Sequence, residues 1–311
     1  MNTAGREILV IGATGRQGGA VARELLGRGY RVRALCRSPD KPAARSLAMS
    51  GVRVIAGDLD DRTSLEAAVD GVHGVFGVQN YWDGAPGSKL GEAGEVRQGK
   101  NLMKAAKDAA VAHFIQSSGG GVTIAPELSV NRGKLAVEEY GRAIGLPLTI
   151  VRGVFFMDNF EDPELGFCSG ISRGQLLMPW DPDTKLQMIA LEDLARFVVM
   201  AFDRPQEFIG MRFDLAGDEL TMLDIANTLS RVLGFPVEFA GSSASLARIR
   251  AQDEDMAELF TAVFKHGFQA AIPQLRALHP GMLTFEDFLR KSGWAERDPG
   301  GRYQPDQLGP S

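Results

Sequence analysis

A cluster of glycines near the start of the chain has the spacing G-x-x-G-x-x-G, at Gly12, Gly15 and Gly18. It follows the apolar run "EILVIG" and precedes a helical pattern that begins near Arg16. Glycine adopts backbone angles that other residues resist, and its missing side chain lets a pyrophosphate approach the main chain. The amides and positive dipole end of the following helix would face that phosphate. The spacing predicts a dinucleotide-binding turn of the Rossmann type, and the alternative is a tight strand–helix turn without a ligand.

The end of the second apolar run indicates which dinucleotide this turn would bind. NAD-binding units usually have an acidic residue there, which holds the ribose 2′-hydroxyl. This sequence reads "ALCRSPDK", so Cys36 and Arg37 stand where the acid is expected. Arg37 and Lys41 can instead pair with a 2′-phosphate, for which a planar guanidinium offers two donors. The residues favour NADP(H) over NAD, and the alternative is that Arg37 is only a solvated loop charge.

The histidines and cysteines indicate neither a metal site nor a reactive thiol. The two cysteines, Cys36 and Cys168, are isolated from each other in the sequence. The histidines are scattered without the spacing of metal ligands, and we interpret all four as structural: His73, His113, His266 and His279.

Short apolar runs alternate with helical stretches over the first half of the chain, which predicts a parallel sheet with helices on both faces. The runs are nearly continuous in apolar residues, as expected of strands buried on both sides. Strands are expected at 7–12, 30–37, 52–59, 72–78, 112–118 and 146–153. Helices are expected at 16–29, 40–51, 61–71, 92–110 and 130–144.

The alternation breaks after Gly153. The stretch "GQLLMPWDPDTKLQMIALEDLARFVVMAF" predicts a hairpin followed by a helix, and the last third is mostly helical. We therefore expect an α/β protein with a Rossmann-type, doubly wound parallel sheet and a smaller, mostly helical C-terminal α/β subdomain. The expected division is an NADP-binding domain over 1–153, a substrate or partner subdomain over 154–298, and a flexible tail over 299–311, which is rich in Pro and Gly.

Composition and charge narrow the classes of function. With 44% hydrophobic and 23% charged residues, the 311-residue chain has the composition of a globular protein. Its net charge of -5, with mixed signs, argues against a nucleic-acid surface, which needs clustered Lys and Arg. There is no long apolar run for a membrane span, and we see no signal peptide. The two cysteines do not form a disulfide framework, which suggests a reducing compartment, so we expect a cytoplasmic protein.

A series of motifs resembles, in order, the NmrA-like proteins of the atypical short-chain dehydrogenase/reductase superfamily. The similarity covers about residues 6–162 and returns weakly at "LTFEDFLRKSGW". The order of the motifs is more specific than any one of them. The motifs are "GATGRQGG", "RSPDK", "GDLDD", "GVFGVQNYW", "EVRQGKNL", "GKLAVEEY" and "LPLTIVRG" followed by "FMDNF".

The resemblance implies a set of cofactor contacts. It assigns the pyrophosphate and the adenosine ribose to Gly12, Thr14, Gly15, Arg16, Gln17 and Gly18. It assigns the 2′-phosphate to Arg37 and Lys41, the adenine to Asp58 and Leu59, and the ribose and nicotinamide side to Gln79 and Asn80. Lys134 matches the lysine that the family has at the start of the helix before the sixth strand. The resemblance places Phe156 and Asn159 near the nicotinamide end of the cofactor.

The ordinary proton donor of a short-chain reductase is missing. Hydride transfer to a carbonyl needs a donor for the developing oxyanion, which is usually a Tyr four residues before a Lys. Here Val130 stands four residues before Lys134, and no Tyr-x-x-x-Lys occurs in the chain. Lys134 and Ser118 are the candidate catalytic residues, and Ser117 is an alternative for holding a substrate oxygen. The alternative is that Lys134 is only a surface lysine at the start of a helix.

Two functions remain, of which the first is favoured. One is an NADPH-dependent reductase of quinones or other apolar carbonyls, in which water or Lys134 supplies the proton. The other is a redox sensor that binds NADP(H) without catalysis, with the long loop over 79–95 as its moving part. Under the first, an apolar pocket is expected from Tyr81, Trp82, Phe155, Phe156, Met157 and Phe160, although such aromatic clusters are as often core.

The expected partners follow from these two functions. They are a small apolar substrate or a regulatory protein. We expect binding to neither nucleic acid nor a membrane, and the sequence does not decide whether the protein is a homodimer. A nucleotide-free scaffold would require an empty glycine turn and is the remotest alternative.

Overall fold

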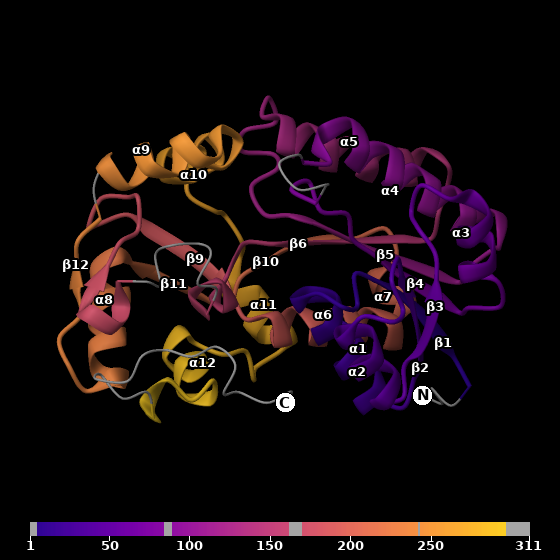
Figure 1. The fold of residues 1–311 in the computed structure, drawn as a ribbon, viewed down its shortest axis with the longest axis horizontal. Helices are drawn as coiled ribbons and strands as arrows, with labels where there is room; N and C mark the ends of the chain where they lie inside the picture. Colours follow the sequence, from indigo (N-terminus) through magenta and orange to yellow (C-terminus); the bar gives the residue numbers. More distant parts are fainter. Residues whose placement is uncertain (1–4, 84–88, 162–169, 242, 297–311) are drawn as a thin grey trace. The chain divides into compact units, whose positions relative to one another are not determined.

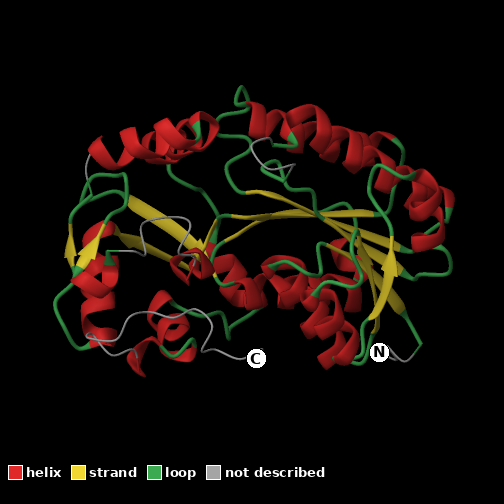
Figure 2. Ribbon diagram, in the orientation of Figure 1, coloured by secondary structure: helices red, strands yellow, loops and turns green. Residues whose placement is uncertain are grey.

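A computed structural model describes residues 5–83, 89–161, 170–241 and 243–296 (Figures 1 and 2). Cys168 and the expected tail over 299–311 lie outside the described residues. None of the described helices is long and apolar enough to cross a membrane.

The chain forms two compact units, and the first is discontinuous in sequence. Unit 1 comprises Met1–Val154 and Leu191–Leu215, and unit 2 comprises Phe155–Ala190 and Ala216–Ser311. The chain first passes from unit 1 to unit 2 after Val154, next to the expected boundary at 153. The return of Leu191–Leu215 to unit 1 differs from the contiguous division that the sequence suggested, because this segment supplies a further strand and two helices to the first unit.

Unit 1 is built on a seven-stranded sheet in which every neighbouring pair is parallel. This confirms the predicted Rossmann-type, doubly wound sheet. The continuous apolar runs explain it, since all five residues of the first strand are buried. In spatial order the strands are β10 (Arg212–Leu215), β6 (Leu148–Gly153), β5 (His113–Gly119), β4 (Gly74–Gly77), β1 (Glu7–Ile11), β2 (Arg31–Cys36) and β3 (Arg53–Ala56).

Helices cover both faces of this sheet (Figure 1). Helices α3 to α5 lie on one face, and α1 and α6 pack together on the other. The core under α3 to α5 includes Leu65, Leu102 and Phe114, all fully buried. The helices of unit 1 are α1 (Arg16–Gly27), α2 (Pro42–Met49), α3 (Arg62–Val69), α4 (Gly91–Asp108), α5 (Ser129–Ala143), α6 (Leu191–Asp203) and α7 (Pro205–Phe208). Asp61 caps the start of α3, where its side chain accepts a hydrogen bond from the Thr63 amide.

A buried histidine lies within the sheet of unit 1. His113 on β5 is 1% exposed, and its Nε2 is 2.8 Å from the Thr149 hydroxyl. Because that hydroxyl donates to the Phe208 carbonyl at 2.7 Å, it accepts from the imidazole. The ring also packs edge-on against Phe202. Burial lowers the pKa of His113 from 6.5 to about 4, with a smaller contribution from His73.

We expect this histidine to make the protein less stable in mild acid. The unfolded chain takes up the proton near pH 6.5 and the folded protein only near pH 4, so the unfolding free energy falls as pH drops through this window. The full loss is about 3 kcal/mol at 1.36 kcal/mol per pKa unit. Urea unfolding from pH 7 to pH 4 measures it. His113→Gln should flatten the profile, and His266→Gln, at an exposed position on α10 (Glu254–His266), should leave it unchanged. An unaltered slope in His113→Gln would contradict the assignment.

Unit 2 has two small sheets and a helical majority. A three-stranded sheet has the order β11 (Asp218–Thr221), β9 (Lys185–Ile189), β7 (Phe155–Phe156), and β8 (Gln175–Leu176) pairs with β12 (Glu238–Phe239). Its core includes Trp180, Ile225 and Phe285. The helices are α8 (Met222–Leu233), α9 (Ser243–Gln252), α10, α11 (Ile272–Leu278) and α12 (Phe285–Lys291), with short 3-10 turns η1 (Met157–Glu161), η3 (Ile171–Arg173) and η4 (Trp294–Glu296).

The predicted hairpin within 175–189 is wrong. Strands β8 and β9 belong to different sheets, with β8 parallel to β12 and β9 between β11 and β7. The buried Trp180 explains the difference: its Nε1 donates to the Phe260 carbonyl at 2.9 Å, which holds the connection in the core of unit 2 instead of in a tight turn.

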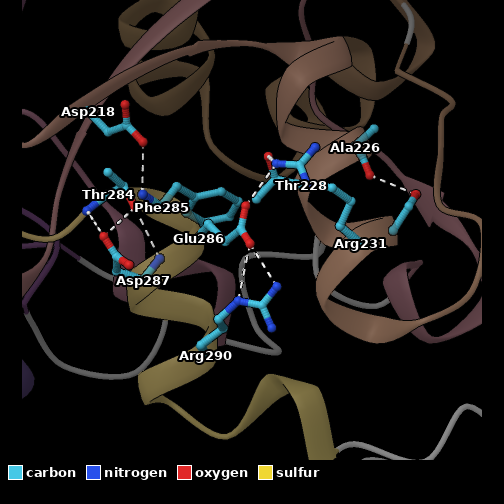
Figure 3. A network of polar contacts seen from close by, with 10 residues as sticks. Asp218, Ala226, Thr228, Arg231, Thr284, Phe285, Glu286, Asp287 and Arg290 are labelled. Carbon is cyan, nitrogen blue, oxygen red and sulfur yellow. Dashed lines mark hydrogen bonds and ion pairs between the residues drawn. The ribbon is translucent and has the colours of Figure 1, made fainter.

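Helix α12 is fixed at its start by a polar network (Figure 3). Thr284 and Asp287 form a capping box. Asp218 of β11 accepts a hydrogen bond of 2.8 Å from the first amide of the helix. Glu286 pairs with an arginine of α8 at 2.9 Å. The segment "LTFEDFLRKSGW" is therefore tied to β11 and α8 within unit 2.

Candidate functional site

The three glycines of the turn after β1 have different structural roles. Gly12 has a φ of +68°, a backbone conformation that favours glycine. Gly18, inside α1, packs so closely that a Cβ would lie 2.4 Å from the Gly12 carbonyl group. Gly15 is the N-cap of α1 and brings no side chain to cap it, and the first helical turn has no acid. The first amides of α1 can therefore donate to an external anion.

This turn lies at the switch point of the sheet. The chain runs from β1 outward to β2 and β3, then returns to β4 on the other side of β1. Ligands of doubly wound sheets bind outside the carboxyl ends of the strands at such a point. A Cβ on Gly12 would lie 3.1 Å from Val78, so the turn packs against the segment that follows β4.

Polar side chains from separate strand ends meet beside the turn. Gln17 Nε2 donates to the Ser117 hydroxyl at 2.7 Å, which joins the start of α1 to the end of β5. Gln116 Nε2 donates to Gln79 Oε1 at 3.0 Å, which joins β5 to the segment after β4. The structure thus brings together Gln17 and Ser117, which the sequence placed at the site although they are 100 positions apart. Gln116, which contacts Gln79, was not among the predicted residues.

Several buried polar atoms on β5 and in the segment after β4 have no hydrogen-bond partner within the described part of the chain. They are Gln79 Nε2, Trp82 Nε1, Gln116 Oε1 and Ser118 Oγ. A buried polar group without a partner costs about 1–3 kcal/mol, so a bound molecule that supplies the partner is favoured there. The uncapped start of α1 and these atoms together fit a dinucleotide and a polar substrate atom.

Lys134 on α5 forms an ion pair with Glu95 on α4. The lysine side chain is 17% exposed and the glutamate 2%. A Cβ on Gly119 would lie 3.2 Å from Lys134 Cδ, so the lysine stem lies against the end of β5. Burial raises the pKa of Glu95, and the ammonium of Lys134 opposes this shift. The sequence did not indicate Glu95, because no local spacing connects it to Lys134.

The residues expected at the 2′-phosphate lie on the surface. Arg37, just after β2, pairs with Asp83 at 2.8 Å, and both side chains are exposed. Lys41 is exposed at the N-cap of α2. The partner Asp83 follows β4, so the pair spans the carboxyl end of β1, which lies between β2 and β4. The sequence did not reveal this pairing.

Asp58 and Leu59 form the turn after β3. Asp58 accepts from the Asp60 amide at 2.8 Å, and the Leu59 carbonyl accepts from Asn101 at 3.0 Å. These bonds hold the turn at the edge of the sheet next to β2. Asn80 begins the tight turn after β4: its Oδ1 accepts from the Trp82 amide at 3.2 Å.

Phe156 and Asn159 belong to unit 2. Phe156 ends β7, pairs with Ile189 and is half-buried, and Asn159 lies in η1. The expectation that the neighbouring side chains form an apolar pocket needs correction. Phe155, Met157 and Phe160 are 8%, 0% and 1% exposed and pack in the core of unit 2. Their side chains therefore present little surface to a ligand.

The strand order and the glycine turn at the switch point define a protein of the Rossmann type. The chain belongs to the NmrA-like family, whose model matches residues 5–289. This match confirms the family resemblance that the order of the sequence motifs indicated.

Curated relatives include two oxidoreductases. The NAD(P)H azoreductase of Xenophilus azovorans is 31% identical over 245 residues, which cover 78% of this chain and 79% of the relative. The NmrA-like family domain-containing oxidoreductase FrzB of a Cladobotryum species is 36% identical over 168 residues. These cover 51% of this chain and 49% of FrzB, so the chain spans about half the length of that relative.

Solved structures share the fold at lower identity. The NADPH-dependent quinone oxidoreductase QOR2 of Escherichia coli, complexed with NADPH, superposes with a TM-score of 0.75 at 21% identity, covering 92% of this chain and 99% of QOR2. NmrA, a negative transcriptional regulator in complex with NADP, gives 0.74 at 24% identity, covering 93% and 95%. At these identities the likeness establishes the fold alone.

Proposed function

We propose that this protein is an NADPH-dependent reductase that transfers hydride to a quinone or another apolar carbonyl. The observation that carries the proposal is the grouping of Lys134 and the unpartnered Ser118 hydroxyl at the carboxyl end of β5, beside the cluster that joins β5 to the glycine turn. Membership in a family whose curated relatives include an NAD(P)H azoreductase supports it.

Each group has a distinct task in this proposal. NADPH, when bound, supplies the hydride. The amides at the start of α1 hold the pyrophosphate, and Gln79 contributes an unpartnered Nε2 donor on the ribose side. The Ser118 hydroxyl orients the acceptor oxygen, and Lys134 gives a proton to that oxygen once it is negatively charged. The missing tyrosine does not prevent this chemistry, because reduction of a quinone needs no strong acid from the protein.

The test is turnover by the full chain. Purified protein is mixed with NADPH and a panel of quinones and aldehydes, and absorbance at 340 nm is followed. Oxidation of NADPH that depends on one of these acceptors is the expected result. Tight NADPH binding with no turnover of any acceptor would overturn the proposal in favour of a sensor.

The same proposal includes a preference for NADPH over NADH. Within the described part of the chain, the exposed Arg37 guanidinium forms an ion pair with the exposed carboxylate of Asp83. Surface pairs of this kind contribute about 0–1 kcal/mol. A phosphate can therefore displace Asp83 and gain charge-assisted hydrogen bonds of about 1.5–3 kcal/mol.

Arg37→Ala should weaken NADPH binding by about tenfold or more, following that energy, and leave NADH binding unchanged. Calorimetric titration with both nucleotides measures the effect. Arg45→Ala, an exposed arginine on α2, is the matched control and should bind both nucleotides as the unmodified protein does. Equal affinity of the unmodified protein for NADPH and NADH would contradict the preference.

The second candidate function is a non-catalytic NADP(H) sensor. The chain has no Tyr-x-x-x-Lys, and the transcriptional regulator NmrA has the same fold. Under this alternative the nucleotide state would change binding to a regulatory protein, and the residues after β4, which reach Arg37 through Asp83, would respond to it.

A further inference from the structure

The ion pair of Glu95 and Lys134 is built into the packing of two helices. Glu95 is 2% exposed, and its Oε2 has no hydrogen-bond partner among the described residues. On the facing helix, a Cβ on Gly133 would lie 2.7 Å from that same oxygen. A side chain at position 133 would therefore displace the carboxylate from this position.

A buried ion pair of this kind is not explained by stability. Removing two charges from water costs several kcal/mol per ion, and apolar side chains of similar size often stabilise a protein as well or better. The position of the pair suggests another role. The Lys134 stem lies against Gly119, and the next residue back along β5 is Ser118, whose buried hydroxyl has no partner in the described chain.

We propose that Glu95 is a positioning residue, which holds the Lys134 ammonium at the carboxyl end of β5, so that the pair takes the place of the missing tyrosine. This inference rests on the proposed function. After hydride transfer the acceptor has a negatively charged oxygen. An N–H bond of the ammonium breaks as an O–H bond forms, which leaves a neutral amine beside Glu95, and water returns the proton to that amine. The 17% exposure of Lys134 gives water access to it.

Other titratable groups around the pair have partners of their own. These groups are Glu92 paired with Arg132, Glu138 paired with Arg152, and the Tyr81 phenol at 2.7 Å from the Ser129 hydroxyl. Among the described residues, Lys134 is the charge that acts on the pKa of Glu95. Removing the charge of Glu95 should therefore act directly on Lys134.

The first experiment measures the protonation of Lys134 without turnover. The full chain, free of nucleotide, is acetylated with acetic anhydride across a pH series, and modification of Lys134 is quantified by mass spectrometry. Glu95→Gln should lower the pH at which Lys134 reaches half-maximal reactivity, because the ammonium loses its neighbouring opposite charge. Glu92→Gln, at a half-buried glutamate one turn earlier on α4 that pairs with Arg132, should cause no shift. An unshifted Glu95→Gln would overturn the inference.

Glu95→Asp separates charge from shape. It keeps the carboxylate and withdraws it by one methylene, so the labelling profile of Lys134 should stay near that of the unmodified protein while kcat falls. It also serves as the informative variant if Glu95→Gln does not fold, and a profile displaced as far as expected for Glu95→Gln would then overturn the role of the charge.

The second experiment follows kcat against pH with an accepted quinone. In Glu95→Gln, the basic limb of the kcat–pH profile should shift to lower pH by the same interval as the labelling profile of Lys134. Turnover with an unmoved limb would overturn this inference alone. A labelling shift in a protein that turns over no acceptor would instead overturn the proposed function, and with it the catalytic role of the pair.

Discussion

Gly18→Ala is expected to remove measurable NADPH binding and to lower the stability of the protein. A Cβ at this position would lie 2.4 Å from the Gly12 carbonyl carbon and oxygen and 2.7 Å from the Ile11 carbonyl. All three are backbone atoms, so no flexible side chain can move aside, and the turn itself must shift. Overpacking of this kind costs about 1–3 kcal/mol. Thermal unfolding measures the stability, and calorimetric titration measures the affinity.

The control for Gly18→Ala is another glycine of the same helix. A Cβ on Gly27, the last residue of α1, meets no heavy atom within 4 Å among the described residues. Gly27→Ala should therefore bind NADPH normally and gain about 0.5–1 kcal/mol of stability from the better helix propensity of alanine. If Gly18→Ala behaved like Gly27→Ala, the close packing of the turn would not be what positions the phosphate-binding amides.

Lys134→Met is expected to lower kcat by about 10²- to 10⁴-fold, the usual contribution of a positioned proton donor. Methionine preserves much of the aliphatic stem that lies against Gly119 and removes the ammonium. Lys134 also matches a cofactor-binding position of the family, so some loss of NADPH affinity accompanies the change. We expect that loss to be much smaller than the loss in kcat. Steady-state kinetics with the accepted quinone, together with NADPH titration, separates the two.

Lys100→Met provides the comparison for Lys134→Met. Lys100 is an exposed lysine of α4 whose ammonium lies 5.4 Å from the ring centre of Tyr140. Its replacement should leave kcat within about twofold, since surface substitutions usually change free energies by less than 0.5 kcal/mol. An unchanged kcat in Lys134→Met would remove the lysine from the mechanism and leave proton supply to water.

Local patterns predicted most of unit 1. The apolar runs predicted strands β1 to β6 to within a few residues, because strands buried on both faces must be apolar throughout. The edge strand β3 was found in the same way although it is only partly buried. The patterns failed where a strand is too short to have a period. Strands β7, β8 and β12 have two residues each, and they form only because neighbours distant in the chain pair with them.

The site shows the same limit. The glycine turn could be recognised from one short stretch, because a turn is a local structure whose residues are consecutive. The contact of Gln17 with Ser117 and the pairs that Lys134 and Arg37 make depend on which strands and helices are neighbours. Strand order is a property of the whole sheet, so Glu95 and Asp83 could not be found from spacing.

The interrupted chain path of unit 1 has a consequence for its biosynthesis. Strand β10 pairs with β6 at the edge of the sheet, yet the whole of Phe155–Ala190 is translated between them. Until Leu191–Leu215 has left the ribosome, one side of β6 presents open backbone groups, which are a template for aggregation. The sheet of unit 1 is therefore completed late in synthesis. A fragment that stops at residue 154 would have the same open edge on β6 and the same tendency to aggregate.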